Sequence, residues 1–174
     1  MPRFRDIPQF TRANYECDSA WVYLESWFGK WAEDGLAVDL EPDYQRVHVW
    51  TPEQQTAYVE FVLRGGTSGR DLYFNCTSWG RKYNTPIEIV DGKQRITAAR
   101  AFMADEIPAF GYKYSQYEDT LSILTASFRF HINDLRTRAE VIQWYLDLNY
   151  AGTPHTDEER ERVQRLLEEA EGRD

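Results

Sequence analysis

The sequence is poor in cysteine and has no long apolar run. Its two cysteines, Cys17 and Cys76, show neither metal-ligand spacing nor a disulfide framework. No apolar run is long enough to span a bilayer, and no apolar core follows Met1–Asp6 as it would in a signal peptide. We therefore expect a cytoplasmic protein with two reduced thiols and no membrane partner.

Basic residues are also scarce relative to acidic ones. The chain has 20 Lys and Arg against 29 Asp and Glu, which gives a formal net charge of −9. Because most of such a surface repels DNA phosphates, any contact with DNA must be local. Much of the acidic excess lies near the C-terminus, at 157–159 and 168–171. These runs form either a solvated helix face or a partner-binding tail.

The chain does contain enough apolar material for one sizeable core. It is 42% hydrophobic and 15% aromatic over 174 residues, a composition that argues against disorder. We expect a single domain over residues 1–174. It would consist of an N-terminal arm and helix (1–35), an α+β core (36–135) and C-terminal helices (136–174).

The N-terminal region predicts an arm followed by a helix. Apolar residues scattered over the first sixteen positions could pack the arm down: Ile7, Phe10 and Tyr15. A helix is expected from Trp21 to about Gly35, with Asp18 or Ser19 as its N-cap. Residues spaced three and four apart would form its buried face: Leu24, Trp27, Phe28 and Trp31.

The next helix has the clearest boundaries in the sequence. Thr51 is a typical N-cap, Pro52 fits the first helical position, and Gln54 completes a capping box. Gly65-Gly66 would end the helix.

The remaining pattern alternates strands and helices. Strands are expected at 36–40, 72–75, 87–90, 107–112 and 123–132. Helices are expected at 96–103, at 137–148, and from a capping box of Thr156 and Glu159 onward. The sequence therefore predicts an α+β fold with a small mixed sheet flanked by helices and a C-terminal helical pair.

One of these strands ends abruptly on a polar turn. The apolar run Ile87–Val90 stops at Asp91-Gly92, and Lys93-Gln94-Arg95 leads into the helix at 96–103. A helix that opens at the end of a strand offers free backbone N–H groups and a positive dipole end, which suit a phosphate.

Together with two other polar clusters, this turn resembles the hallmark blocks of a known family. The blocks are Tyr44-Gln45-Arg46 with Trp50, Asp91-Gly92-Lys93-Gln94-Arg95, and Asn149 to Glu159, in that order. They resemble the ParB/sulfiredoxin-fold family that contains the N-terminal domain of GmrSD-type restriction enzymes, which act on modified DNA. The resemblance implies a ParB/sulfiredoxin-like fold.

The resemblance also implies binding of nucleotides or phosphates at the Asp-Gly turn, with NTP hydrolysis or phosphotransfer as related activities. Sulfinic-acid repair is excluded, because sulfiredoxins carry a cysteine at the position of Lys93. The arginine-rich CTP-binding block of chromosome-partitioning ParB proteins has no counterpart here. No helix-turn-helix region and no HNH nuclease half are recognisable in the 174 residues.

Each polar side chain then has an expected role. Arg46 and Arg95 would clamp phosphate oxygens, and Lys93 would add a mobile point charge. Asp91 could hold a divalent metal such as Mg²⁺, polarise a water, or act as a base. Gln45 and Gln94 could orient the attacking water or read a base edge.

The other candidate residues contribute backbone or a second wall. Gly92 would bind phosphate at the turn. A second wall of the nucleotide pocket would be formed by Asn149, Gly152 and Thr153, for which an ordinary helix–helix loop is the alternative. The three histidines lack short metal spacing and are interpreted as satisfied or surface residues: His48, His131 and His155. Of these, His155 is the best functional candidate, because it lies in the third block.

Three functions follow for this pocket. The leading hypothesis is a nucleotide-binding domain that hydrolyses an NTP, ATP or GTP first, or transfers a phosphoryl group, in DNA modification, restriction or phage–host conflict. The first alternative is a nuclease or DNA-directed enzyme that uses the same pocket on a phosphodiester. The second is a non-catalytic, nucleotide-switched module that docks a protein partner or acts with a nuclease subunit in trans.

Overall fold

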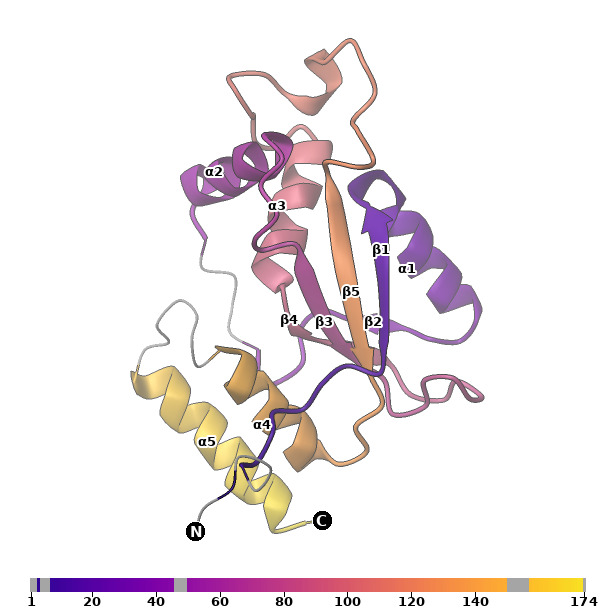
Figure 1. The fold of residues 1–174 in the computed structure, drawn as a ribbon, viewed down its shortest axis with the longest axis vertical. Coiled ribbons are helices and arrows are strands. Elements are labelled where there is room, and N and C mark those ends of the chain that lie inside the picture. The colour runs from indigo at the N-terminus through magenta and orange to yellow at the C-terminus, as the bar shows by residue number, and fades with distance from the viewer. Residues whose placement is uncertain (1–2, 4–6, 46–49, 150–156, 174) are drawn as a thin grey trace.

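A five-stranded mixed sheet forms the centre of the molecule (Figure 1). The computed structural model describes residues 3, 7–45, 50–149 and 157–173. The strands are β1 (Tyr15–Ala20), β2 (Val38–Asp39), β3 (Asp71–Asn75), β4 (Ile87–Asp91) and β5 (Ser127–Asn133). Their order in the sheet is β1-β5-β3-β4-β2. Because β1/β5 and β3/β4 are antiparallel whereas β3/β5 and β2/β4 are parallel, the predicted mixed sheet is confirmed.

Three helices cover one face of this sheet and enclose the larger hydrophobic core. They are α1 (Leu24–Glu33), α2 (Pro52–Leu63) and α3 (Lys93–Met103). Alternate strand residues such as Phe74, Ile89 and Phe130 point into this core, as the two-residue period of a strand requires. Phe74 stacks on Phe130 with ring centroids 5.6 Å apart, and Trp31 meets both rings edge-on. Apolar burial on this face therefore fixes the register of β3, β4 and β5.

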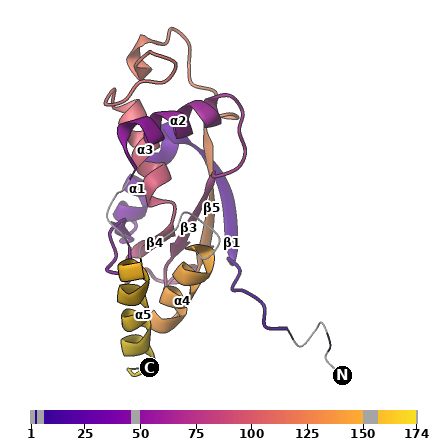
Figure 2. The same cartoon turned by 90° about the vertical axis from the view of Figure 1, so that its left-hand side faces the viewer.

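A second, smaller cluster lies on the opposite face. It is built from α4 (Arg138–Asn149) and α5 (Asp157–Glu171), the expected C-terminal helical pair. Val90 belongs to this cluster although its neighbour Ile89 belongs to the first, because successive strand residues face opposite sides. Both views show α4 and α5 side by side at the end of the molecule away from α2 (Figures 1 and 2). Strand β4 is thus packed on both faces.

The α2 boundaries agree with the sequence, whereas the start of α1 does not. Thr51 and Gln54 form the predicted capping box, and the helix ends before Gly65. The predicted caps Asp18 and Ser19 instead lie in β1, and a 3₁₀ turn at Trp21–Tyr23 precedes α1. Strand pairing with β5 uses the backbone of this segment, so it cannot begin a helix.

Two predicted strands are also corrected. Residues 107–112 form a tight turn with only an isolated bridge between Ala109 and Tyr112, because Phe110 and Gly111 adopt positive φ values of 50° and 83°. The strand expected from 123 begins only at Ser127, and Leu124 before it is 85% exposed. Local apolar runs therefore overestimated the extent of the sheet.

The N-terminal arm packs on the domain only close to β1, where Ala13 contacts the second cluster and Asn14 N–H donates to the Ile132 carbonyl oxygen. Figure 2 shows it leading away from the start of β1, and Phe10 is 76% exposed. Within the part of the chain that the structure describes, no helix is both long and apolar enough to cross a bilayer.

Candidate functional site

The turn between β4 and α3 requires a glycine. Gly92 has φ +112° and forms the N-cap of α3. A Cβ here would overlap the Leu72 side chain and lie 3.4 Å from both Arg95 Nη2 and the Asp71 carbonyl oxygen. Only glycine combines this backbone conformation with so close an approach of neighbouring atoms. This tight turn therefore brings Asp91 next to the first residues of α3.

The N-terminus of α3 carries two basic residues and lacks a side-chain cap. The helix begins at Lys93, earlier than predicted, so Lys93 and Arg95 lie in its first turn. By contrast, α2 has a capping box and Glu53 in its first turn, whereas the first turn of α3 contains no acidic residue. Backbone N–H groups of the first turn have no intrahelical acceptor, so they can donate to an anion.

Arg95 is largely buried at this helix end. Its Nη2 donates to Asp91 Oδ2 at 2.5 Å, and the Arg95 side chain is 18% exposed. The Arg95 Nε atom is buried without a hydrogen-bond acceptor among the described residues. An unmet charged donor is costly, so an anion that accepted from it would be favoured. This pair joins the last residue of β4 to the first turn of α3.

Lys93 forms an ion pair with Glu41. Its ammonium group lies 2.9 Å from Glu41 Oε1, with the Lys93 side chain 11% exposed and Glu41 79% exposed. A largely desolvated ammonium paired with an exposed carboxylate can exchange that partner for a phosphate at low cost. The expected role of Lys93 as a mobile charge toward phosphate stays a prediction, and Glu41 is the partner that Lys93 would have to leave.

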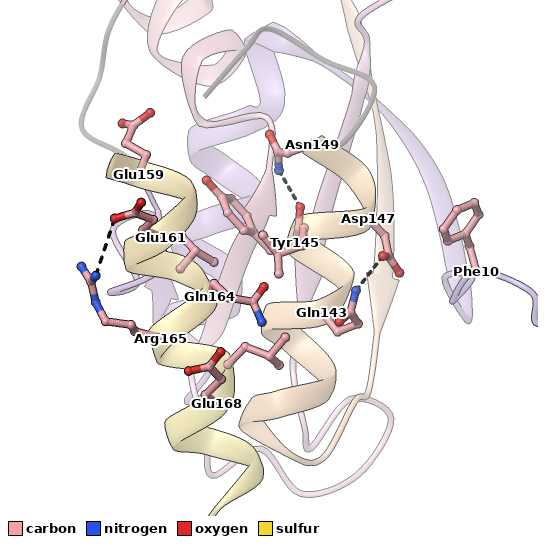
Figure 3. A pocket seen from close by; sticks show the side chains of 13 residues that line it. Phe10, Gln143, Tyr145, Asp147, Asn149, Glu159, Glu161, Gln164, Arg165 and Glu168 are labelled. Atoms are coloured by element: carbon pink, nitrogen blue, oxygen red, sulfur yellow. Dashed lines mark hydrogen bonds and ion pairs between the residues drawn. The ribbon is translucent and has the colours of Figure 1, made fainter. Parts of the chain in front are cut away.

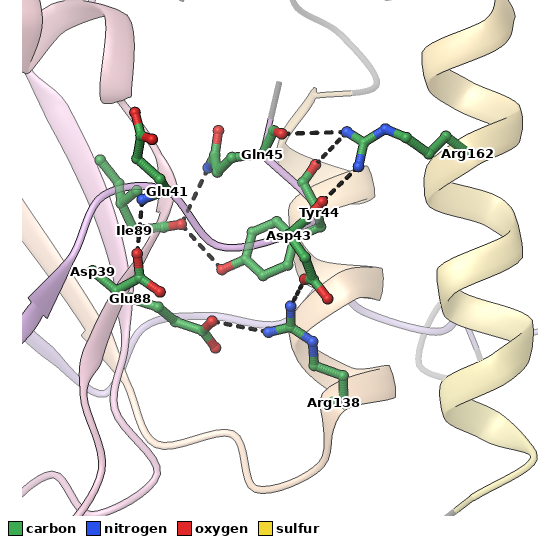
Figure 4. A network of polar contacts seen from close by, with 9 residues as sticks. All are labelled: Asp39, Glu41, Asp43, Tyr44, Gln45, Glu88, Ile89, Arg138 and Arg162. Atoms are coloured by element: carbon green, nitrogen blue, oxygen red, sulfur yellow. Dashed lines mark hydrogen bonds and ion pairs between the residues drawn. The ribbon is translucent and has the colours of Figure 1, made fainter. Parts of the chain in front are cut away.

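The first motif is attached to the strand that carries the second (Figure 4). Gln45 Nε2 donates to the carbonyl oxygens of Ile89 and Val90 at 3.1 and 2.8 Å. The Tyr44 hydroxyl donates to the Ile89 carbonyl at 3.0 Å, and the Tyr44 ring is fully buried. β2 pairs only with Ile87 and Glu88 of β4. Tyr44 and Gln45 donate to the carbonyl groups of the next two residues of that strand.

Gln94 binds the backbone of Trp50, the first described residue after 46–49. Its Oε1 accepts a hydrogen bond from the Trp50 backbone N–H at 3.2 Å, and Gln94 is buried. Arg46 lies outside the described residues, but the residues on either side of 46–49 are both held near β4 and α3. The structure therefore gives both glutamines a backbone-positioning role, and an additional role in orienting water stays a prediction.

Only part of the third block can be placed. Asn149 is the last residue of α4, and its Nδ2 donates to the Tyr145 carbonyl oxygen at 2.8 Å. Gly152 and Thr153 lie outside the described residues, as does the predicted cap Thr156. A second wall of the pocket therefore stays a prediction.

A groove of about 800 Å³ between α4 and α5 begins beside Asn149, but its charge does not suit phosphate (Figure 3). Four carboxylates and one arginine line it: Asp147, Glu159, Glu161, Glu168 and Arg165. This excess of carboxylates would repel a phosphate. The anion-binding chemistry is instead concentrated at the start of α3.

Tyr73 is a neighbour of the site that sequence reasoning missed. It lies opposite Asp91 in the β3/β4 pairing and stacks on His131 with ring centroids 4.5 Å apart. Burial and the nearby Asp71 and Asp91 charges raise the pKa of Tyr73. The alternation along β3 puts Asp71 and Tyr73 on one face, which is the signal that could have identified them.

His131 confirms the interpretation as a satisfied histidine. Its Nε2 lies 2.7 Å from Asp71 Oδ1 and its Nδ1 lies 3.0 Å from Glu16 Oε1. Among the described residues, no group of three or more His, Cys, Asp or Glu side chains could enclose a metal ion. A divalent ion at Asp91 would therefore need coordinating oxygens from a bound nucleotide or from water.

The family is identified by comparison with known proteins. The family described as the GmrSD restriction endonuclease, N-terminal domain, matches residues 26–171. The chain belongs to this family. No curated protein and no solved structure matches the chain. The range matched by the GmrSD N-terminal domain contains all three of the sequence blocks. It begins after β1.

In this GmrSD-family domain, Glu88 adds a buried titrating group beside the first motif (Figure 4). Arg138 Nη1 lies 2.9 Å from Glu88 Oε2, and Arg138 also pairs with Asp43 and lies over the Tyr44 ring, 4.6 Å from its centroid. Burial and then the charge of Asp39 raise the pKa of Glu88 to about 7, and a hydrogen bond with Tyr44 opposes this rise. The carboxyl therefore titrates near neutral pH.

Glu88→Gln is expected to remove a pH dependence of stability. The folded protein keeps a proton on Glu88 that the unfolded chain loses above its pKa of 4.5. The stabilisation is full below pH 4.5 and is lost as pH rises through about 7. From urea unfolding, we expect the variant to gain about 2 kcal/mol over wild type between these limits. Glu25→Gln, at an exposed ion pair, is the control, and parallel profiles for wild type and Glu88→Gln would contradict the prediction.

Proposed function

We propose that this domain binds a nucleoside triphosphate at the turn between β4 and α3, and that it hydrolyses the nucleotide or transfers its phosphoryl group. The observation that carries the proposal is the buried Arg95 Nε, which has no acceptor among the described residues and lies at an uncapped helix N-terminus. Triphosphate oxygens supply the acceptors that both features lack. ATP and GTP are the first candidates.

The described residues divide the work of binding. Arg95 and the N–H groups of the first turn would hold phosphate oxygens, with Lys93 leaving Glu41 to add a second cation. Asp91 fits a divalent ion such as Mg²⁺ as a single carboxylate ligand, with nucleotide oxygens and water completing the shell. Such an ion supplies neutralisation of the phosphate charge. Asp91 would have to leave Arg95 before it could serve in this way or as a base.

Family membership supports a restriction setting for this activity. The matched family is named for a restriction endonuclease, so we propose a role in modification-dependent restriction. With a net charge of −9, the domain would contact DNA locally, and cleavage would be supplied by a nuclease subunit or domain that it regulates. The same charge disfavours a nuclease that uses this pocket on DNA itself.

The experiment is nucleotide binding and turnover by the purified chain. ATP, GTP, CTP and UTP are titrated with Mg²⁺ in a calorimeter, and phosphate release is followed separately. We expect micromolar to millimolar binding of at least one nucleotide, with release of phosphate that Asp91→Asn abolishes. If no nucleotide binds, the proposal fails.

A non-catalytic nucleotide switch is the second candidate. Asp91 is engaged by Arg95, and Gln45 and Gln94 are engaged by backbone groups. These three side chains already have protein partners, which suits holding a nucleotide without turning it over. Saturable binding without phosphate release would favour this function over hydrolysis.

A further inference from the structure

The loop between β3 and β4 is basic, whereas the chain as a whole is acidic. Residues 72–86 include Arg81 and Lys82 but no Asp or Glu, in a chain of net charge −9. Both side chains are exposed, and neither forms an ion pair with any residue that the structure describes. Arg100 of α3 and Arg129 of β5, by contrast, each pair with a carboxylate. The two loop cations are therefore available to an external anion.

A network of hydroxyl groups closes the base of this loop. Ser78 Oγ lies 2.9 Å from Thr85 Oγ1, and Thr77 Oγ1 donates to Thr85 Oγ1 at the same distance. The Asn84 backbone N–H donates to Ser78 Oγ at 3.4 Å. These contacts join the first residues of the loop to its last, so Arg81 and Lys82 lie at the tip of a closed structure.

Trp79 fastens the loop to the rest of the domain. Its ring centroid lies 5.5 Å from that of Tyr15 in β1 and 6.2 Å from that of Trp31 in α1. Within the loop it lies 6.1 Å from the Tyr83 ring. Because these aromatic contacts order the loop in advance, a ligand at its tip would meet little of the ordering cost of binding.

Two more cations lie on neighbouring segments at this end of the sheet (Figure 1). The Asn133 side chain donates to the Arg12 carbonyl oxygen at 3.0 Å, and the Asn133 carbonyl oxygen accepts from the Cys76 N–H at 2.9 Å. Arg136 follows Asn133 by three residues. Arg12 and Arg136 are exposed, and among the described parts of the chain neither has an ion-pair partner.

Carboxylates border this cationic surface and limit its extent. Asp134 accepts a hydrogen bond from the Asn14 side chain, and Glu140 accepts one from the Arg136 backbone N–H at 3.0 Å. Two exposed carboxylates at the end of α1 border the surface on the side of Trp31: Glu33 and Asp34. The cationic surface is therefore local, as a contact between an acidic domain and a polyanion requires.

We propose that this surface binds the phosphate backbone of duplex DNA, with Arg81 and Lys82 as its principal contacts. The inference rests on the restriction setting of the proposed function, which makes DNA the polyanion, but it does not depend on nucleotide turnover. Cations on an ordered loop and on neighbouring segments suit a row of phosphates. Such contacts position a protein on DNA without reading its sequence.

The DNA surface and the proposed nucleotide site lie at opposite ends of β4. The strand begins at Ile87, directly after this loop, and ends at Asp91, beside the start of α3. At that second end Lys93 and Arg95 are each paired with a carboxylate. Variants at the loop tip therefore change one surface and leave the other intact.

The test is binding of a fluorescein-labelled duplex of about 20 base pairs, followed by anisotropy at several salt concentrations. For wild type we expect a Kd of roughly 1 to 100 μM and, for four phosphate contacts, a slope of about −4 in log K against log salt. Arg81→Ala/Lys82→Ala should weaken binding by about tenfold or more and reduce the slope by about 2. Arg81→Lys/Lys82→Arg keeps both charges and should bind like wild type.

A second double variant controls for net charge. Lys113→Ala/Arg165→Ala also removes two cations, one from the segment between α3 and β5 and one from α5. Figure 1 shows that segment at the other end of the sheet. We expect DNA binding by this variant to match wild type. Circular dichroism checks the fold of every variant, and calorimetry with ATP checks the nucleotide site.

The outcomes separate this inference from the proposed nucleotide site. If wild type binds no duplex even at low salt, the inference fails, whereas ATP binding is decided by its own titration. Equal losses of DNA affinity in the two double-alanine variants, or a similar loss in Arg81→Lys/Lys82→Arg, would overturn phosphate contact at the loop. Binding of polyglutamate as tightly as DNA would assign the surface to an acidic protein and overturn it as well. A loss confined to Arg81→Ala/Lys82→Ala, with the fold intact, supports it.

Discussion

Arg95→Ala is expected to weaken nucleotide binding by about 100-fold, or roughly 2.7 kcal/mol. The side chain contributes a fork of donors at the start of α3, and its Nε lacks an acceptor among the described residues before a ligand arrives. Arg95→Lys keeps the charge but not the fork, so we expect an intermediate affinity. Calorimetry with the nucleotide that wild type binds measures both variants.

The same change should leave the fold intact. Asp91 loses its partner at 2.5 Å, but its side chain is 29% exposed and can be hydrated, so we expect a cost of about 1 kcal/mol. Arg100→Ala is the control, because Arg100 lies in the last turn of the same helix and pairs with Glu25. Equal losses of affinity in Arg95→Ala and Arg100→Ala would show that general charge, and not the fork at the turn, attracts the nucleotide.

Predictions from local sequence were most reliable where short-range chemistry determines the structure. The α2 start follows from Thr51, Pro52 and Gln54, which satisfy the helix's first donors without help from the rest of the chain. The turn after β4 follows in the same way from Asp91-Gly92, although the helix begins earlier than expected. These motifs are local, so tertiary contacts did not overturn them.

Predictions failed where the determining partner lies far away in sequence. β1 was missed because its outer residues Glu16 and Asp18 are charged, and their partners His131 and Arg129 are in β5. A strand with one charged face looks like an irregular segment until its neighbour is known. The second hydrophobic cluster was not predicted for the same reason, because Tyr44 is far in sequence from α4 and α5, against which it packs.

In the candidate site, too, local features were predicted and contacts between distant segments were not. Local sequence predicts the Asp91-Gly92 turn but did not predict the Asp91–Arg95 pair, in which Asp91 belongs to β4 and Arg95 to α3. It could not predict that Gln45 binds the backbone of β4, or that Gln94 binds the backbone of Trp50. These two glutamines link the two motifs: Gln45 holds the strand that leads into the second motif, and Gln94 holds the backbone of Trp50 beside the first.

Gly92→Ala is expected to destabilise the protein by about 3 kcal/mol. Part of this cost arises because an L-residue rarely adopts φ +112°, and part because the new methyl group would overlap Leu72. Urea unfolding followed by circular dichroism measures the loss. Gly29→Ala is the matched control, since Gly29 lies within α1 with no atom within 4 Å of its built Cβ, and we expect that variant to gain up to about 1 kcal/mol.

The two sources of the Gly92→Ala cost can be separated with Leu72. Leu72→Ala alone should cost about 3 kcal/mol, because Leu72 is fully buried. In the double variant the overlap is gone and only the backbone strain of residue 92 remains, so the combined loss should fall short of the sum by about 1 to 2 kcal/mol. Strict additivity would mean that strain at φ +112° accounts for the whole effect. A Gly92→Ala variant as stable as wild type would instead show that the turn can relax, and that the close approach of β3 to the start of α3 does not constrain the site.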